Sequence, residues 1–199
     1  AMVMFLNPAS AQMNIDMGSS SAGIVMGQNT DTLPPGCNEI SGQENRTVEA
    51  GKMFAEEYPS KVFTYSEKSY EFEPCTKLTV EFTNNDDIRH QWMVHGLPEE
   101  VYSMGMFTLE ATNGTAEGTF ILPAEDETYL VHCGLPQHMQ KGMKAQIIVG
   151  EGDGEISNIP GRTGNPIGYE YPGQDSGVMA AASVLTALVA GFAVTYFYI

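Results

Sequence analysis

A cysteine, a histidine and a methionine follow one another at short spacing toward the end of the chain. Cys133 is followed after five residues by His138 and after ten by Met143. A thiolate, an imidazole and a thioether together form the ligand set that soft copper ions prefer. Because a glycine and a proline lie between the cysteine and the histidine, we expect these donors on a turn and not on a helix. The spacing therefore predicts three ligands of a copper site.

A second histidine ligand is expected upstream, in the sequence HQWMVH that begins at His90. Side chains alternate along a strand, so His90 shares a face with Trp92, whereas His95 lies on the other face. If Trp92 belongs to the core, His90 points inward at the end of the domain, toward the loop that carries Cys133. We therefore predict His90 as the fourth ligand and keep His95 as the less favoured alternative.

The elements that position these donors are predicted to be strands. Stretches rich in β-branched and aromatic residues lie at 61–65, 70–72, 76–82, 90–94, 118–122, 128–133 and 145–150. Turn-forming clusters such as NNDD, TNG and AED separate them. Only 49–57 and 98–104 suggest short helices. The pattern predicts one β-sandwich over residues 37–150, which is long enough to enclose a core.

The three cysteines leave two arrangements open. In the first, Cys37 and Cys75 form a disulfide that ties the start of the domain to the strand at 76–82, and Cys133 remains a free thiolate. In the second, Cys37 is an additional copper thiolate. An exported protein with an odd number of cysteines must keep one of them unpaired or bond it outside the chain.

The ends of the chain predict export and anchoring. Residues 1–11 end in Ala-Ser-Ala, an A-x-A cleavage site after an apolar run, and are interpreted as a signal-peptide remnant. Residues 12–36 form a polar, Gly/Ser-rich stretch that we interpret as a flexible leader. Residues 151–177 are rich in glycine and proline and are predicted to be a linker. Residues 178–199 carry no charge, and a helix of that length spans roughly 33 Å, enough to cross a bilayer.

The excess of acidic over basic residues limits which kinds of partner the chain is expected to bind. The chain has 9 basic and 25 acidic residues, with a formal net charge of -16. Nucleic-acid binding requires basic surface and is therefore excluded. An acidic surface suits a basic redox protein as partner.

The sequence FEPCTKLTVEFTNND, followed by RHQWMVHG and by YLVHCGLPQHMQKGMKAQIIVG, resembles the cupredoxins over about 100 residues. The whole layout is similar to that of the small membrane-anchored copper proteins found with particulate methane and ammonia monooxygenases, the PmoD/AmoD type. This resemblance implies a Greek-key β-sandwich with a single C-terminal transmembrane helix. It implies a position at the periplasmic face of a bacterial inner or intracytoplasmic membrane. The implied function is electron transfer, or copper delivery and assembly, for that monooxygenase.

The stretch DDIRHQWMVHGL also resembles the dinuclear copper (CuA) domain of cytochrome oxidase. Those domains carry a second cysteine four residues before the first, where this chain has Tyr129. Four residues separate Cys133 from His138, a spacing that fits a mononuclear site better. A second thiolate could still come from Cys37 or from a partner chain in a homodimer. The additional soft donors in this region are His95, His132, Met93 and Met139.

Two further interpretations concern the function. An enzyme with a catalytic copper needs an open coordination position, which Met143 is expected to close, so we do not expect an enzyme. A structural accessory subunit of the membrane complex, with incidental copper binding, is the remaining alternative.

Overall fold

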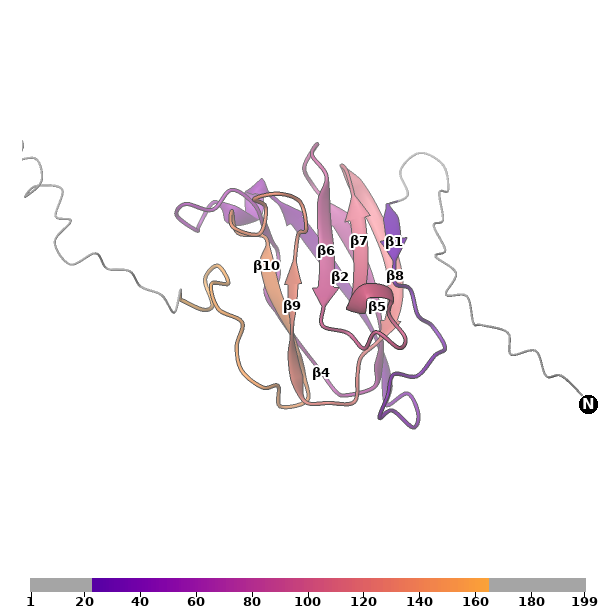
Figure 1. The fold of residues 1–199 in the computed structure, drawn as a ribbon. Helices are drawn as coiled ribbons and strands as arrows, with labels where there is room; N and C mark the ends of the chain where they lie inside the picture. The colour runs from indigo at the N-terminus through magenta and orange to yellow at the C-terminus, as the bar shows by residue number, and fades with distance from the viewer. Residues whose placement is uncertain (1–22, 165–199) are drawn as a thin grey trace, which may run out of the picture. The chain divides into compact units, whose positions relative to one another are not determined.

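The computed structural model describes residues 23–164, which form two β-sheets packed face to face (Figure 1). The larger sheet has six strands in the order β1-β7-β6-β9-β10-β4, and the smaller has four in the order β3-β2-β5-β8. The strands are β1 (Ile24–Met26), β2 (Gly42–Gly51), β3 (Thr64–Tyr65), β4 (Ser69–Phe72), β5 (Thr76–Asn84), β6 (His90–His95), β7 (Met106–Ala111), β8 (Gly114–Ile121), β9 (Glu127–His132) and β10 (Lys144–Val149). Two short 3-10 helices, η1 (Lys52–Ala55) and η2 (Ser103–Gly105), lie between strands. The predicted all-β sandwich is confirmed for these residues.

The core lies between the sheets and is organised around Trp92 of β6. This side chain is 1% exposed, and its ring meets Phe107 edge-on at 6.3 Å and Tyr70 at 6.1 Å. Each such aromatic pair contributes about 0.5–1.5 kcal/mol beyond the burial of its area. Because this packing fixes which face of β6 points inward, His90 also points into the sandwich and is fully buried.

The pairing of β6 with β9 brings two distant segments to the same end of the sandwich. The strands are antiparallel, with Met93 opposite His132 and Val94 opposite Val131. Continuing this register places the residue that follows β9, Cys133, beside the start of β6. β10 then returns antiparallel to β9 and pairs in parallel with β4 on its other side. The loop between β9 and β10 therefore lies over the beginning of β6.

Helical structure is scarcer than the sequence suggests. The helix expected at 49–57 is wrong in its first part, because the chain is still in β2 up to Gly51, and only η1 follows. β2 lies between β3 and β5, and its backbone groups bond to those neighbours, so sheet pairing overrides the local preference for a helix. At 98–104 the helix is limited to the short η2, which begins at Ser103.

Segments on both sides of the expected domain pack against it. The predicted leader, 12–36, includes β1, which pairs antiparallel with β7. The predicted linker, 151–177, begins with residues that lie against β10. There the Ile156 N–H donates to the side-chain oxygen of Gln146 at 2.8 Å, and Ile159 is 1% exposed. The first part of the linker is therefore docked on the sandwich.

The predicted signal-peptide remnant at 1–11 and the predicted membrane helix at 178–199 lie outside the described residues. So does the remainder of the linker after residue 164. None of the helices within residues 23–164 has the length and apolar character that crossing a bilayer requires.

Candidate metal centre

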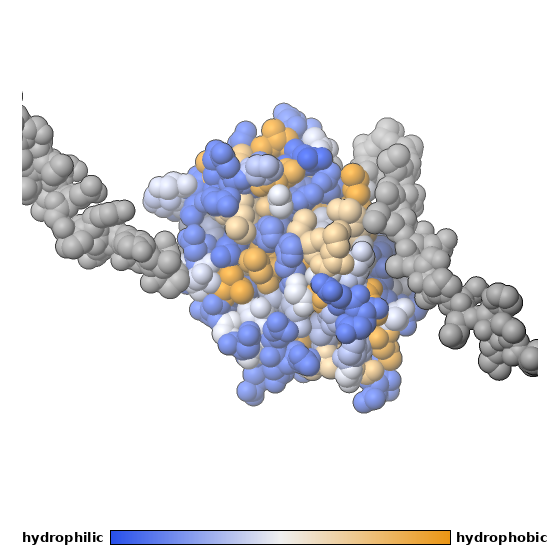
Figure 2. Space-filling model, in the orientation of Figure 1, coloured by the Kyte–Doolittle hydropathy of each residue, from blue (hydrophilic) through white to orange (hydrophobic). Residues whose placement is uncertain are grey.

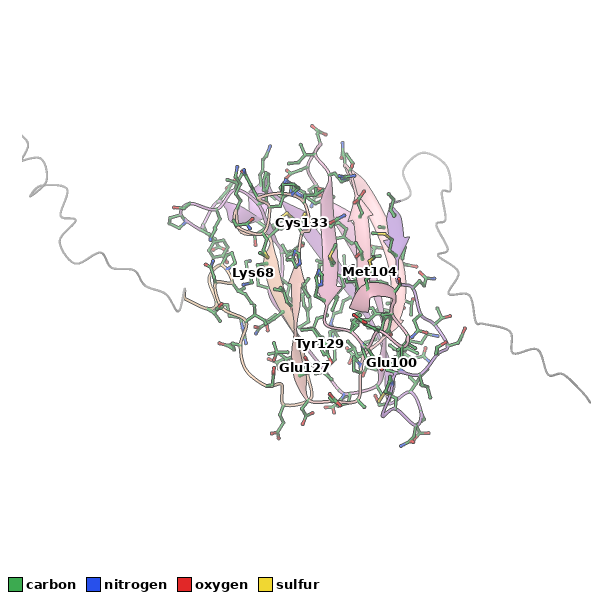
Figure 3. All side chains as sticks on the ribbon, viewed as in Figure 1. Lys68, Glu100, Met104, Glu127, Tyr129 and Cys133 are labelled. Atoms are coloured by element: carbon green, nitrogen blue, oxygen red, sulfur yellow. A yellow bond between two sulfur atoms is a disulfide. The ribbon has the colours of Figure 1, made fainter. Side chains whose placement is uncertain are left out.

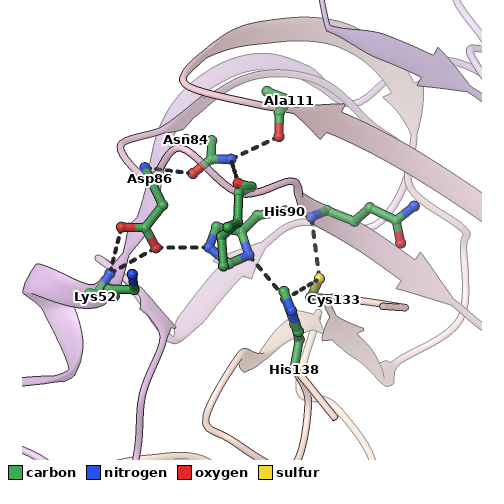
Figure 4. A network of polar contacts seen from close by, with 9 residues as sticks. Lys52, Asn84, Asp86, His90, Ala111, Cys133 and His138 are labelled. Atoms are coloured by element: carbon green, nitrogen blue, oxygen red, sulfur yellow. Dashed lines mark hydrogen bonds and ion pairs between the residues drawn. The ribbon is translucent and has the colours of Figure 1, made fainter. Parts of the chain in front are cut away.

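Three of the predicted ligands meet at one end of the sandwich. The ligand atoms of His90, Cys133 and His138 all lie within 4.8 Å of one another. The Nδ1 atoms of the two histidines are 3.1 Å apart, and Cys133 Sγ lies 3.5 Å from His138 Nδ1 (Figure 4). His90 and Cys133 are almost completely buried, whereas His138 is partly exposed. Figure 3 shows Cys133 where β9 ends, close to the start of β6. We call these three residues the inner cluster.

Backbone hydrogen bonds hold the ligand loop in place. The His138 N–H donates to the Leu135 carbonyl at 3.1 Å and closes the turn. The Met143 N–H donates to the His138 carbonyl at 3.0 Å, and the Cys133 N–H donates to the Met143 carbonyl at 3.2 Å. Met143, the fourth predicted ligand, is fully buried immediately before β10. These bonds close the loop between the paired strands β9 and β10 on itself. Its ligand residues therefore have little freedom to move.

Asp86 fixes the orientation of the His90 ring. Its Oδ2 lies 2.9 Å from His90 Nε2. A carboxylate only accepts, so we assign the Nε2 proton to this bond, which leaves the lone pair of Nδ1 facing the inner cluster. The proton in the 3.1 Å contact between the rings then belongs to His138. Carboxylate–histidine pairs of this kind orient metal-binding imidazoles and raise their basicity.

Asp86 is itself held by neighbours from two other segments (Figure 4). Its N–H donates to the side-chain oxygen of Asn84 at 2.9 Å, and the Lys52 N–H donates to both of its carboxylate oxygens at 3.2 and 3.3 Å. Asn84 is buried, and its side-chain NH₂ donates to the Ala111 carbonyl at 2.8 Å. The position of the His90 ring is thus determined by strands of both sheets.

Opposing influences act on the pKa of the buried Cys133 thiol. Burial raises its pKa above the ordinary value for a cysteine, and the Gln91 N–H, which lies 3.4 Å from Sγ, acts in the opposite direction. The protonated thiol is therefore favoured near neutral pH. Since the thiolate is the metal ligand, binding of a metal ion here releases a proton.

Both histidines of the inner cluster are kept neutral. Burial lowers the pKa of His90 and of His138, and the neighbouring His90 lowers the pKa of His138 further. A neutral imidazole has a free nitrogen lone pair, which is the form that binds a metal ion. At neutral pH the Nδ1 lone pair of His90 already faces the inner cluster, whereas Nδ1 of His138 becomes a ligand when its proton moves to Nε2.

Phe63 covers the inner cluster. Its ring stacks on that of His138 at 4.8 Å and meets the His90 ring edge-on at 5.0 Å. Phe63 is 7% exposed. The aromatic ring therefore limits rotation of both imidazoles and keeps water from that side of the donors.

The structure does not bring Cys37 to this site. Cys37 and Cys75 are joined in a disulfide. Cys75 directly precedes β5, and Asn84, beside the inner cluster, is the last residue of that strand. Nine residues of strand span about 30 Å. The alternative in which Cys37 is a copper thiolate is therefore wrong, since this cysteine is distant and its sulfur is already bonded.

The other additional candidates also lie apart from the inner cluster. His95 and His132 are stacked on each other, with ring centroids 4.9 Å apart, on the outer face of the larger sheet. Met139 is partly buried in the turn after His138, where its carbonyl accepts the Gly142 N–H at 3.2 Å. Neither additional histidine belongs to the group of close donors formed by His90, Cys133 and His138.

Sequence reasoning missed Asp86, Asn84 and Phe63. It assigned Asp86 only to a turn, although a carboxylate four residues before a predicted histidine ligand is a usable signal for a group that orients the ring. Phe63 gave no such signal, because its contacts with the site depend on how the two sheets pack. Asn84 lies only two residues before Asp86, but its buried bond to the Ala111 carbonyl forms only in the folded sandwich.

No family model and no curated protein matches the sequence. Among solved structures, auracyanin B is similar at 18% identity over 62% of this chain and 94% of its own, with a TM-score of 0.43. Auracyanin A, a blue copper protein from Chloroflexus aurantiacus, is similar at 21% identity over 54% of this chain and 100% of its own, with a TM-score of 0.39. A multi-copper oxidase from Pseudomonas thermotolerans is similar at 16% identity over 58% of this chain and 31% of its own, with a TM-score of 0.42. Because these TM-scores are below 0.5, a functional proposal has to rest on the geometry of the inner cluster.

Proposed function

We propose that this chain is a copper protein that binds the ion through His90, Cys133 and His138, with Met143 as a weak fourth ligand. The observation that supports it is the meeting of two imidazoles and a thiol within 4.8 Å, from two segments that are distant in the sequence. A site with two histidines, one cysteine and a weak thioether is the donor set of copper centres that transfer electrons. When bound, copper would supply a one-electron carrier.

The surroundings of the inner cluster favour electron transfer. Asp86 holds one ring, Phe63 lies on both rings, and the Gln91 N–H points at the sulfur. Donors that are held in this way change position little when the charge at their centre changes by one. A small rearrangement is what fast electron transfer requires.

A mononuclear centre is favoured over a dinuclear one shared between two chains. Cys133 is the one free cysteine in the part of the chain that the structure describes, and it is 1% exposed. A second thiolate would have to come from a partner chain and reach a buried sulfur. The three donors meet within a single chain without it.

We further propose that the protein serves a membrane copper monooxygenase for methane or ammonia, from the periplasmic face of a bacterial membrane. The support is in the sequence: the uncharged segment 178–199, the signal-peptide remnant and the resemblance to the PmoD/AmoD type. The net charge of -16 suits a basic redox protein as electron partner. Delivery of copper to the monooxygenase is the second candidate, and it is favoured by the further soft donors His95, His132 and Met93 on the outer face of the same strands.

The test is the absorption and the electron paramagnetic resonance spectrum of the copper-loaded full chain. We expect a visible thiolate-to-copper charge-transfer band and the hyperfine pattern of one copper ion. Cys133→Ser should abolish the band, because serine offers no thiolate. A Cys133→Ser protein that keeps the full band would overturn the proposal. Slow loss of copper to a competing chelator would favour electron transfer, and rapid loss would favour delivery.

A further inference from the structure

A second pair of histidines lies on the face of the sheet opposite the inner cluster. His95 ends β6 and His132 ends β9. Their rings are almost parallel, with planes 6° apart and centroids 4.9 Å apart. Side chains alternate along a strand, so His95, five residues after His90, and His132, directly before Cys133, both point away from the core. The same two strands thus carry imidazoles on both faces.

One ring nitrogen of this histidine pair has no hydrogen-bond partner among the described residues. His132 Nδ1 is buried, and nothing in the described range 23–164 forms a hydrogen bond with it. A buried polar atom without a partner costs about 1–3 kcal/mol. A ligand that bonds to this nitrogen would remove that cost. A metal ion is such a ligand, and the adjacent imidazole of His95 offers it a second nitrogen.

A thioether lies at the same place. Met93 is paired with His132 across the two strands, so their side chains share the outer face, and Met93 is two residues before His95. Its side chain extends over Gly134. A Cβ atom added to that glycine would lie 2.9 Å from the terminal methyl of Met93 and 3.7 Å from its sulfur. Because Gly134 lies two residues beyond His132, on the side away from His95, the flexible Met93 side chain has to turn back over His132 to bring its sulfur to an ion held by the two imidazoles.

We propose that His95, His132 and Met93 form a second copper site, an outer cluster that takes Cu(I). This site is distinct from the inner cluster and does not depend on copper there. Imidazole nitrogen binds both zinc and copper, whereas a thioether selects the softer Cu(I). Within residues 23–164, no cysteine or carboxylate joins the two imidazoles to make a group of three. The donor set of the outer cluster is therefore soft, and it leaves a coordination position open.

The outer cluster is accessible to an ion from solution. His95, His132 and Met93 are all partly exposed. The face over β6, β7 and β9, drawn in Figure 2, shows apolar residues among polar ones across its middle. An ion bound there would be easier to exchange than one in the inner cluster, whose cysteine and first histidine are at most 1% exposed.

The test is a titration of the full chain with Cu(I), without oxygen and in competition with a coloured Cu(I) chelator. We expect the unaltered chain to hold two equivalents of copper. His95→Gln should hold one, and after oxidation with ferricyanide it should still show the thiolate-to-copper band. His138→Gln should also hold one but lose the band. The double variant should hold none.

Each other result has a definite meaning. The outer cluster is overturned if His95→Gln holds as many equivalents of Cu(I) as the unaltered chain. If the band never forms but His95→Gln still loses one equivalent, the proposed function fails and the outer cluster stands. Met93→Leu should weaken the second equivalent of Cu(I) and leave zinc binding at the two histidines unchanged. Equal Cu(I) affinity in Met93→Leu and the unaltered chain would remove Met93 from the site.

Discussion

The inner and outer clusters both use donors from β6 and from the end of β9, with a cysteine and a loop histidine only in the inner one, and they differ in what surrounds them. In the inner cluster, His90 is bonded to Asp86 and covered by Phe63, and Cys133 receives the Gln91 N–H. In the outer cluster, the corresponding imidazole, His132, has a buried nitrogen without a partner. The inner donors are thus arranged in advance, whereas the outer ones become satisfied only when something binds them.

The alternation of side chains along a strand explains how one strand pair produces both clusters. His90 and His95 lie an odd number of positions apart, and so do His132 and Cys133, so each of these two segments places one donor on each face. The inner face is enclosed by the second sheet, which supplies the orienting groups. The outer face has no sheet above it in the described residues, so its donors remain accessible. The position of each donor relative to the core therefore decides to which cluster it belongs.

The largest expected effect is on the free energy of unfolding. It tests whether both clusters depend only on the pairing of β6 with β9. Replacing Cys37 and Cys75 together by alanine removes a cross-link between residues 38 apart, which should lower the free energy of unfolding by about 4 kcal/mol. Because the disulfide lies at the far end of β5, both equivalents of copper should be retained under conditions in which the chain is folded. Denaturant unfolding followed by copper titration measures the two quantities. Loss of either copper equivalent in the folded variant would show that the disulfide also positions that cluster.

The next effect concerns the inner cluster alone. Asp86→Asn keeps the size of the side chain but removes the carboxylate that orients His90, and changes of this kind typically cost 10–100-fold in metal affinity. We expect a weakening of about that size for inner copper, with outer copper unchanged, in the chelator competition. Asp87→Asn is the matched control, since Asp87 accepts from the Asn113 side chain and has no recorded contact with either histidine of the inner cluster. Equal affinities in the two variants would contradict the orienting role of Asp86.

A smaller effect is expected at the cover of the inner cluster. Phe63→Leu keeps an apolar side chain but removes the stacked ring, at a cost of about 1 kcal/mol in folding free energy. Inner copper should then exchange faster with a chelator, because water reaches the donors, while the outer copper exchanges at its former rate. Phe107→Leu serves as control: Phe107 packs on Trp92 and Phe120 in the core, so its replacement costs stability without changing the exchange. Equal acceleration in both variants would mean that loss of stability, and not loss of the cover, is the cause.

The smallest effect is expected where the clusters approach each other. Gly134 follows Cys133, and a Cβ there would meet the ends of the Met93 and Gln91 side chains at 2.9 and 2.8 Å. Because the Gln91 end is held by hydrogen bonds to Glu110 and to the Gly134 N–H, whereas the Met93 end is flexible, Gly134→Ala should displace Met93 slightly and weaken outer copper by less than tenfold, equivalent to less than about 1.4 kcal/mol. The thiolate-to-copper band of the inner cluster should be unchanged. A shift of that band with unchanged outer affinity would reverse the assignment of Met93 to the outer cluster.

The parts of the fold with regular alternation could be predicted from sequence. The strands at 76–82 and 90–94 were expected because apolar residues recur at every second position, and β5 and β6 cover them. β7 was missed because nearly all of its residues are buried, so it shows no alternation. β2 was missed for another reason: its sequence is mostly polar and becomes a strand only through parallel pairing with β5. Such pairing leaves no local mark in the sequence.

The same limit applies to the inner cluster. Its three central donors were predicted, because the spacing of Cys133 and His138 and the phase of His90 relative to Trp92 are local properties. Their supporting groups were not, because the Asn84 side chain reaches the Ala111 carbonyl, and Phe63 contacts the imidazoles, only after the two sheets have packed. The disulfide was one of two arrangements that the sequence left open for Cys37. Only the structure distinguishes between them, because it joins Cys37 to Cys75 at the end of β5 that lies far from the inner cluster.

The parallel pairing of β10 with β4 has a consequence for the rate of folding. It joins Gln146 to Ser69, which are 77 residues apart, so an entropically costly loop must close before this part of the sheet is stabilised. Sandwiches dominated by contacts of this kind fold on the order of milliseconds to seconds, far more slowly than proteins with local contacts. The turn that carries His138 lies directly before β10 and is anchored only when that strand has paired. We therefore expect copper to bind late, to a chain that has already folded, and not to nucleate the folding reaction.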